Sequence, residues 1–296
     1  MDHYELKARA KINLTLDVLS KRPDGYHEVE MIMQTIDLAD SVIFQEAREG
    51  VLVTTDHPQL AAGESNIAYR AARLMMEKFG VSKGIKIHIA KRIPVAAGLA
   101  GGSTDAAAVL SGLNRIWGLG LRLEELAELG AEIGSDVPFC VIGGTALAKG
   151  RGEILTALPA APEMWLVLVK PDLEVSTAEV YKNFTPAKVG RHPDTQAAVK
   201  AIYDGDTQKL LNNLVNVLES VTLATYPEVE RVKKTMTAEG ISSVLMSGSG
   251  PTVFGVAASR AVAEQQAQAL GQKLPGMFVT VTRTSPACQQ EFVGRG

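Results

Sequence analysis

The feature that most constrains this chain is a glycine-rich segment, Pro94-Val95-Ala96-Ala97-Gly98-Leu99-Ala100-Gly101-Gly102-Ser103-Thr104-Asp105, which lies between a predicted strand and a predicted helix. The helix is expected over 106–117, with Ser103 or Thr104 as its N-cap. Backbone N–H groups at such a helix start can bind an anion, and glycine allows close approach. The segment is neither a Walker A loop nor a GxGxxG fingerprint. Phosphate binding and a plain turn before a packed helix both remain open.

Composition excludes several classes of protein. The chain has 296 residues, which predicts roughly two domains, and the short segment 158–162 is the candidate boundary. The net charge of -3 and the two cysteines, far apart, argue against nucleic acid as the main partner and against a structural zinc site. We find no signal-peptide pattern, and no apolar run approaches the roughly 20 residues that cross a bilayer. We therefore expect a cytoplasmic protein with neither a nucleic-acid nor a membrane partner.

An alternating pattern over 8–18 predicts a strand with one apolar face. Its other face carries Arg9, Lys11, Asn13, Thr15 and Asp17. For an arbitrary strand such a polar face is most often solvated.

The rest of the chain predicts further strands and helices. Strands are expected at 42–44, 51–53, 84–90, 165–169, 244–246, 253–256 and 277–282. Helices are expected at 67–79, 122–133, 177–181, 197–201, 208–218, 228–237 and 260–270. A second glycine turn, Ser247-Gly248-Ser249-Gly250-Pro251, lies between two of these strands and is either a tight hairpin or a second phosphate-facing loop.

One isolated acid is a candidate proton acceptor. Phosphoryl transfer to an alcohol needs a group that accepts the hydroxyl proton and a cation for the developing charge. Asp136, in Gly134-Ser135-Asp136-Val137-Pro138-Phe139, follows a predicted helix, and Lys11 could pair with it from the polar strand face. A turn or N-cap aspartate is the alternative. The five histidines are dispersed and no HExxH occurs, so a histidine-rich metal site is not expected.

Three segments together resemble the GHMP kinase superfamily: the strand around Lys11, the segment 94–104, and Leu245-Met246 followed by the second glycine turn. The segments 10–14, 22–27 and 134–139 make the match specific to one of its branches. The chain departs from the usual pattern at Ala100, where glycine is more frequent, and at Thr104, where serine is usual. The resemblance implies an α+β, two-domain fold. It comprises an N-terminal domain, 1–160, like domain 2 of ribosomal protein S5, and a ferredoxin-like C-terminal domain, 161–296.

The resemblance also implies a site. Lys11 and Asp136 would be the catalytic pair, with Asp136 as base. ATP would contact Asn66, Pro94, Val95, Ala96, Ala97, Gly98, Leu99, Ala100, Gly101, Gly102, Ser103 and Thr104. The substrate would contact Asn13, Tyr26, His27, Thr177, Tyr181, Gly248, Ser249 and Gly250. Tyr26 and His27 would hold a cytosine ring that Tyr181 closes from the other side, and ATP would bring Mg²⁺, for which we assign no ligands.

The implied activity is ATP-dependent phosphorylation of the 2-hydroxyl of a cytidine-diphosphate-linked methylerythritol, in the non-mevalonate route to isoprenoids. Two alternatives stay open: another acceptor, such as homoserine, mevalonate or a sugar, and a nucleotide-binding protein without catalysis. Tyr26 and His27 favour the first activity because the other acceptors carry no base. The sequence leaves the oligomeric state open.

Overall fold

The larger of two sheets is built on two long antiparallel strands. The computed structural model describes residues 3–58, 60, 63–286 and 292–295. Strands β1 (His3–Lys21) and β2 (His27–Ala47) pair along almost their whole length, and three register shifts bend them. Within the described residues the sheet has eight strands, in the order β12-β1-β2-β4-β3, with β5 added beside β2, β6 beside β5 and β8 beside β1. The other members are β3 (Val51–Thr55), β4 (Gly84–Ala90), β5 (Thr145–Lys149), β6 (Ile154–Leu158), β8 (Val215–Asn216) and β12 (Phe292–Arg295).

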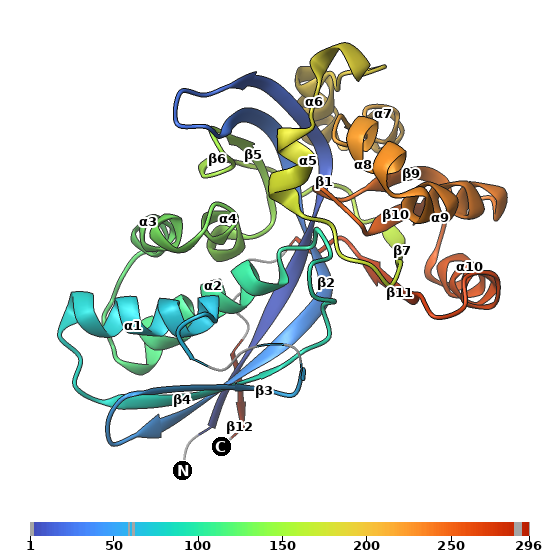
Figure 1. The fold of residues 1–296 in the computed structure, drawn as a ribbon. Coiled ribbons are helices and arrows are strands. Elements are labelled where there is room, and N and C mark those ends of the chain that lie inside the picture. The colour runs from blue at the N-terminus through green and yellow to red at the C-terminus, as the bar shows by residue number, and fades with distance from the viewer. Residues whose placement is uncertain (1–2, 59, 61–62, 287–291, 296) are drawn as a thin grey trace.

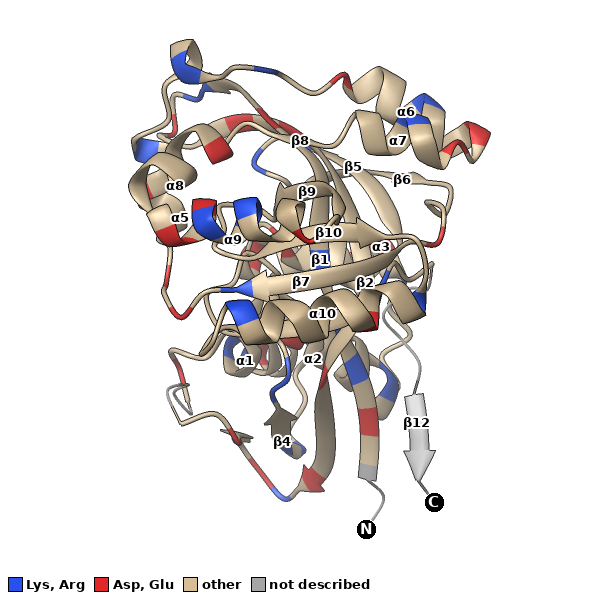
Figure 2. Ribbon diagram, turned by 90° about the vertical axis from the view of Figure 1, so that its right-hand side faces the viewer, with Lys and Arg blue, Asp and Glu red and all other residues tan. Residues whose placement is uncertain are grey.

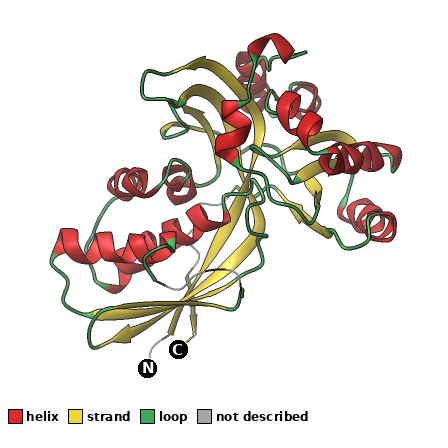
Figure 3. Cartoon of the chain, in the orientation of Figure 1, coloured by secondary structure: helices red, strands yellow, loops and turns green. Residues whose placement is uncertain are grey.

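The smaller sheet is antiparallel and lies beside the middle of the long strands (Figures 1 and 3). Its described strands follow the order β11-β7-β10-β9. Their bounds are β7 (Trp165–Lys170), β9 (Ser242–Met246), β10 (Val253–Ala257) and β11 (Phe278–Arg283). Figure 2, turned by 90°, shows α10 in front of this sheet and charges of both signs interspersed over that side of the molecule.

Helices cover the outer faces of both sheets (Figure 3). Over the larger sheet lie α1 (Ile67–Phe79), α2 (Gly101–Ile116), α3 (Leu123–Ile133) and α4 (Val137–Ile142). The later helices are α5 (Thr177–Lys182), α6 (Thr195–Asp204), α7 (Thr207–Asn212), α8 (Glu219–Thr225), α9 (Pro227–Ala238) and α10 (Arg260–Lys273), with a 3-10 turn at Pro186–Lys188. The mixed architecture confirms the expected α+β class.

Both faces of β1 are covered by protein. Leu16 and Val18 pack with the helices over the larger sheet, whereas Ile12 and Leu14 pack with the smaller sheet, so the register shift between Asn13 and Thr15 breaks the predicted single apolar face. Lys11, Asn13, Thr15 and Asp17 are all buried, and Lys11 and Asn13 line the same cavity as Leu16, whereas Asp17 pairs with His192. The solvated polar face expected of an arbitrary strand is therefore not found in β1.

Two local predictions are also wrong. The helix predicted over 208–218 is instead α7, the two-residue strand β8 and the start of the turn into α8. Helix α2 begins at Gly101, with Ala100 as N-cap in the left-handed conformation (φ +58°), so neither Ser103 nor Thr104 is the cap. The glycines themselves therefore form the first turn of α2. The predicted boundary segment 158–162 begins at the last residue of β6 and ends before β7, but β8 and β12, from the later half, join the larger sheet.

Candidate active site

A cavity of about 950 Å³ lies where β1, the start of α2 and α5 meet. This volume is at the upper end of the range for small-molecule sites, about 300–1,000 Å³, and has room for more than one ligand. The predicted site residues that line it are Lys11, Asn13, Tyr26, His27, Ala96, Ala97, Gly98, Ala100, Gly101, Gly102, Ser103, Asp136, Thr177, Tyr181, Gly248 and Ser249. Residues far apart in the chain are thus brought to one site.

Lys11 and Asp136 form the polar centre of the cavity. Lys11 Nζ lies 3.6 Å from Asp136 Oδ2 and donates a 2.9 Å hydrogen bond to Asn13 Oδ1. Asp136 is the N-cap residue of α4, but its side chain makes no cap hydrogen bond and is about a third exposed. The predicted pairing is confirmed, and the carboxylate is available to a ligand rather than used as a cap.

The glycine-rich loop presents the first turn of α2 to the cavity. The first N–H groups of an α-helix have no carbonyl partner within the helix, and the dipole adds partial positive charge there. Ala96 and Ala100 both have positive φ, +50° and +58°, a conformation that glycine adopts more readily. The more frequent glycine at position 100 thus has a conformational reason.

The two glycine loops are packed against one another. A Cβ on Gly98 would lie 2.3 Å from the carbonyl oxygen of Ser247, and Ser247 Oγ donates a 3.0 Å hydrogen bond to the Gly98 carbonyl. The buried Asn216 amide donates to the carbonyls of Met246 and Gly248 at 2.8 and 2.7 Å. The second loop is the hairpin between β9 and β10, and it forms a wall of the cavity.

Aromatic side chains gather at the far end of the cavity. The rings of His27 and Tyr181 stack with centroids 5.3 Å apart, and Phe184 meets His27 edge-on at 6.5 Å. Tyr26 is 55% exposed, and the Arg151 guanidinium lies 4.9 Å from its ring centroid. Tyr181 therefore stacks directly on His27, too close for a cytosine ring between them as the sequence predicts, and Arg151 lies over one ring face of Tyr26.

Burial and nearby charge set the protonation of these aromatic groups. Burial lowers the pKa of His27, and the nearby Lys21 lowers it further. Burial raises the pKa of the Tyr181 phenol, and Asp136 adds to the shift. At neutral pH His27 is therefore a neutral imidazole with one donor and one acceptor nitrogen, and Tyr181 keeps its proton.

Six predicted site residues are not among those that line the cavity. Thr104 is fully buried, and its hydroxyl donates a 2.6 Å hydrogen bond to the Arg9 carbonyl. Asn66 caps α1 by accepting from the N–H of Ala68. Leu99 is in the core, and its carbonyl accepts from the N–H of Lys11. The others are Pro94, Val95 and Gly250. Their contact with a ligand stays a prediction, and each has a structural role or position of its own.

Three positively charged side chains that the sequence does not predict line the cavity. Lys21, Arg151 and Lys182 line it together with Lys11, while Asp136 is the one carboxylate among the described lining residues. The excess of positive charge suits a ligand with several phosphates. Arg151 stands between Gly150 and Gly152, a glycine-rich turn that is the only local signal it offers.

No group of three or more His, Cys, Asp or Glu side chains that could hold a metal occurs among the residues that the structure describes. In the same part of the chain no helix is long and apolar enough to cross a membrane.

Comparisons with known proteins give a consistent result. Residues 66–144 match the GHMP kinases N terminal domain, and residues 198–276 match the GHMP kinases C terminal domain. The chain is 60% identical to the 4-diphosphocytidyl-2-C-methyl-D-erythritol kinase of Bacillus velezensis, over 84% of this chain and 86% of the relative. It is 49% identical to the enzyme of that name from Caldicellulosiruptor saccharolyticus, over 97% and 98%. A crystal structure of 4-(cytidine 5'-diphospho)-2C-methyl-D-erythritol kinase, 35% identical, superposes with a TM-score of 0.80 over 95% of this chain and 99% of that one.

Proposed function

This chain belongs to the GHMP kinase family, among the 4-diphosphocytidyl-2-C-methyl-D-erythritol kinases, and from that premise we propose how its cavity carries out the reaction. ATP is the phosphate donor, and the acceptor is the 2-hydroxyl of 4-diphosphocytidyl-2-C-methyl-D-erythritol. The products are the 2-phosphate and ADP.

One observation supports this assignment above all others: the Lys11–Asp136 pair and the first turn of α2 line the same cavity. In the proposed step Asp136 accepts the proton of the 2-hydroxyl while the oxygen of that hydroxyl forms a bond to the γ-phosphorus. The bond from that phosphorus to the β,γ-bridging oxygen breaks, and ADP leaves with the electron pair. Lys11 orients the carboxylate and offsets charge on the phosphoryl oxygens, while Asn13 holds the Lys11 ammonium in place.

We place the ATP phosphates over the segment 96–103, because Gly101, Gly102 and Ser103 of the first α2 turn line the cavity and N–H groups at a helix start can bind phosphate. A nucleotide-bound Mg²⁺ usually keeps several waters and is held largely by the phosphates. That arrangement suits a chain with no cluster of metal-ligating side chains among its described residues. The ion would supply charge neutralisation at the β- and γ-phosphates.

We place the cytosine ring at the aromatic end of the cavity. The His27 ring can hydrogen-bond the base edge in its neutral form, and the exposed Tyr26 ring offers the face opposite Arg151 for stacking. Tyr181 and Phe184 pack against His27 and hold it in position. Lys21 and Arg151 are suited to the diphosphate. Homoserine, mevalonate or a simple sugar would leave this end unused.

The test is coupled ADP release with each acceptor, using Asp136→Ala and, as a matched control, Asp172→Ala at an exposed site. We expect turnover with the cytidine substrate only, and a loss of kcat of about 10²–10⁴-fold in Asp136→Ala, the usual contribution of a general base. The control should keep wild-type kcat. Near-normal turnover by Asp136→Ala would refute the base assignment, and equal turnover with homoserine would refute the acceptor.

A further inference from the structure

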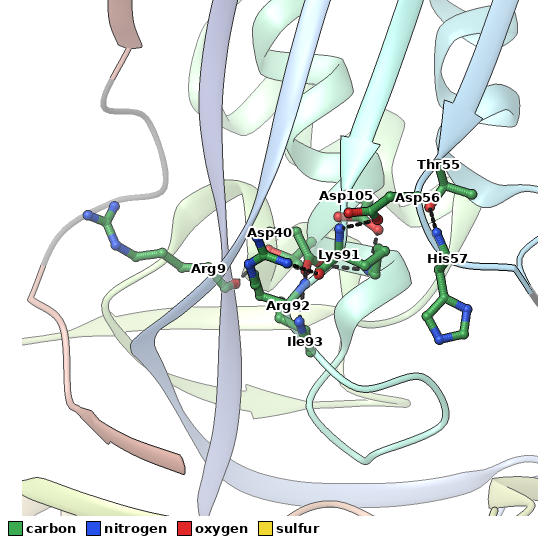
Figure 4. Close-up of polar contacts among 10 residues, drawn as sticks. Arg9, Asp40, Thr55, Asp56, His57, Lys91, Arg92, Ile93 and Asp105 are labelled. Carbon is green, nitrogen blue, oxygen red and sulfur yellow. Dashed lines mark hydrogen bonds and ion pairs between the residues drawn. The ribbon is translucent and has the colours of Figure 1, made fainter. Parts of the chain in front are cut away.

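Three buried ionisable side chains meet where the two ends of the glycine-rich loop come together (Figure 4). Lys91 precedes the loop, Asp105 follows it on α2, and Asp40 belongs to β2. Lys91 Nζ lies 2.5 Å from Asp40 Oδ2 and 2.7 Å from Asp105 Oδ2, and none of the three side chains is more than 5% exposed. One ammonium therefore joins the two ends of the loop to each other and to the sheet.

Asp40 also holds the entry of the loop through its backbone. Its Oδ1 accepts hydrogen bonds from the N–H groups of Arg92 and Ile93, at 2.5 and 2.8 Å. On the exit side, a Cβ built on Gly101 would lie 3.5 Å from Lys91 Nζ. The ammonium thus lies against the first turn of α2, and that turn lines the cavity.

The charges of this cluster balance only if it holds a proton. Two carboxylates and one ammonium would leave a net negative charge buried behind a phosphate-binding turn. Asp105 Oδ1 is buried and has no hydrogen-bond partner within the described part of the chain. A carboxylate oxygen is rarely left so, because desolvating its charge is costly, whereas a protonated carboxyl carries no such charge.

The electrostatics of Asp105 agree with this geometry. Burial raises the pKa of Asp105 most, Lys91 lowers it and Asp40 raises it, and the result is about 8. Burial lowers the pKa of Lys91, but Asp105 and Asp40 outweigh it and raise the pKa overall.

Few other titratable groups lie near the cluster. Asp56, which accepts from the Lys91 N–H, and the Arg92 guanidinium lie at its exposed edge. From α4, burial raises the pKa of the Cys140 thiol, and the charges of Asp136 and Asp105 add to the shift. On β1, Arg9 offers its backbone carbonyl to Thr104, the neighbour of Asp105. Asp105 is therefore the group of this neighbourhood that changes charge just above neutral pH.

We propose that Asp40, Lys91 and Asp105 are positioning residues for the nucleotide, and that Asp105 acts there as a protonated carboxyl that keeps the cluster neutral beneath the first turn of α2. This inference rests on the proposed function, because it takes the loop to be the ATP site. It predicts that a net negative charge in the cluster weakens ATP binding and leaves binding of the cytidine substrate unchanged.

The test is steady-state kinetics with ATP and the acceptor varied separately, together with direct binding of ATP. Asp105→Asn keeps the cluster neutral, so its KM for ATP should stay within about twofold of wild type. Lys91→Met leaves Asp40 uncompensated and should raise the KM for ATP about tenfold or more, the size of an unfavourable charge at a partly buried helix N-terminus. The KM for the acceptor should change little in either variant. Lys86→Met, exposed on β4, is the matched control.

Two further measurements keep the test decisive if Lys91→Met folds poorly. The double variant Asp40→Asn/Lys91→Met restores neutrality and should recover much of the ATP affinity. From about pH 7 to about pH 9 the wild-type KM for ATP should rise, while that of Asp105→Asn stays flat. A tenfold rise in the KM for ATP in Asp105→Asn, or identical pH profiles, would overturn the inference. If the wild type itself binds no ATP, the proposed function fails instead.

Discussion

Gly98→Ala tests the contact between the two glycine loops. Gly98 has φ +73°, and an added Cβ would lie 2.3 Å from the Ser247 carbonyl oxygen and 2.9 Å from that of Gly250. Both neighbours are backbone atoms, so no side-chain rotation relieves the overlap. The hairpin between β9 and β10 would have to move away from the glycine-rich loop.

The expected loss of stability has two parts. A non-glycine residue in the left-handed region costs about 1–2 kcal/mol. Separating the loops also weakens the hydrogen bond from Ser247 Oγ to the Gly98 carbonyl, at 3.0 Å, and that from the Thr252 N–H to the Ala97 carbonyl, at 3.4 Å. Each such bond contributes about 1 kcal/mol. The total is about 3–4 kcal/mol.

Gly240→Ala is the matched control, because Gly240 has φ +74° and a Cβ there would meet nothing within 4 Å. It should lose only the conformational part, about 1–2 kcal/mol. Urea unfolding of the three proteins, followed by circular dichroism, measures the difference of about 2 kcal/mol. Equal losses in the two variants would refute the argument that packing between the loops requires glycine at position 98.

Three further predictions follow from other contacts. Asn216→Ala removes a buried amide that bonds the Met246 and Gly248 carbonyls, and should lower the free energy of unfolding by about 2–3 kcal/mol in urea unfolding. Arg151→Met should raise the KM for the cytidine substrate but not for ATP in the coupled assay, because the guanidinium lies over Tyr26. The pKa of Asp105 is about 8 in the folded chain against an ordinary value of 3.8, so between these values the folded chain holds a proton that the unfolded chain lacks. The contribution of protonated Asp105 to the free energy of unfolding is complete below about pH 4 and is lost as the pH rises toward about 8. Between about pH 5 and about pH 8, thermal unfolding should therefore show a larger loss of stability in the wild type than in Asp105→Asn.

Patterns within one segment predicted much of this structure. The alternation at 84–90 corresponds to β4, and the capped run at 67–79 to α1. These elements form from periodicity and caps that lie within the segment itself. The pairing of Lys11 with Asp136 was also predictable, because each belongs to a short segment whose chemistry limits its role.

Elements that depend on a distant partner could not be predicted in this way. Residues 208–218 have helical periodicity, yet α7 ends at Asn212, and Val215 and Asn216 pair in parallel with Thr15 and Leu16 of β1. No neighbouring residue signals that pairing. Lys91, Asp40 and Asp105 likewise form one cluster only because β2 brings Asp40 to the ends of the loop.

The glycines of the site show why a motif and its physical cause have to be separated. From the sequence alone, glycine in the segment 98–102 predicts room for phosphate. In the folded chain a Cβ on Gly98 would strike the second glycine loop, one on Gly102 would lie 3.2 Å from Ile67 Cγ2, and one on Gly101 would lie 3.1 Å from Ile93 Cγ2. Each of these contacts is internal to the protein and exists without a ligand. The glycines therefore first allow the loop, the hairpin and the start of α2 to pack closely. That packing in turn fixes the N–H groups of α2 at the edge of the cavity, so a substitution here is expected to reduce stability together with nucleotide affinity.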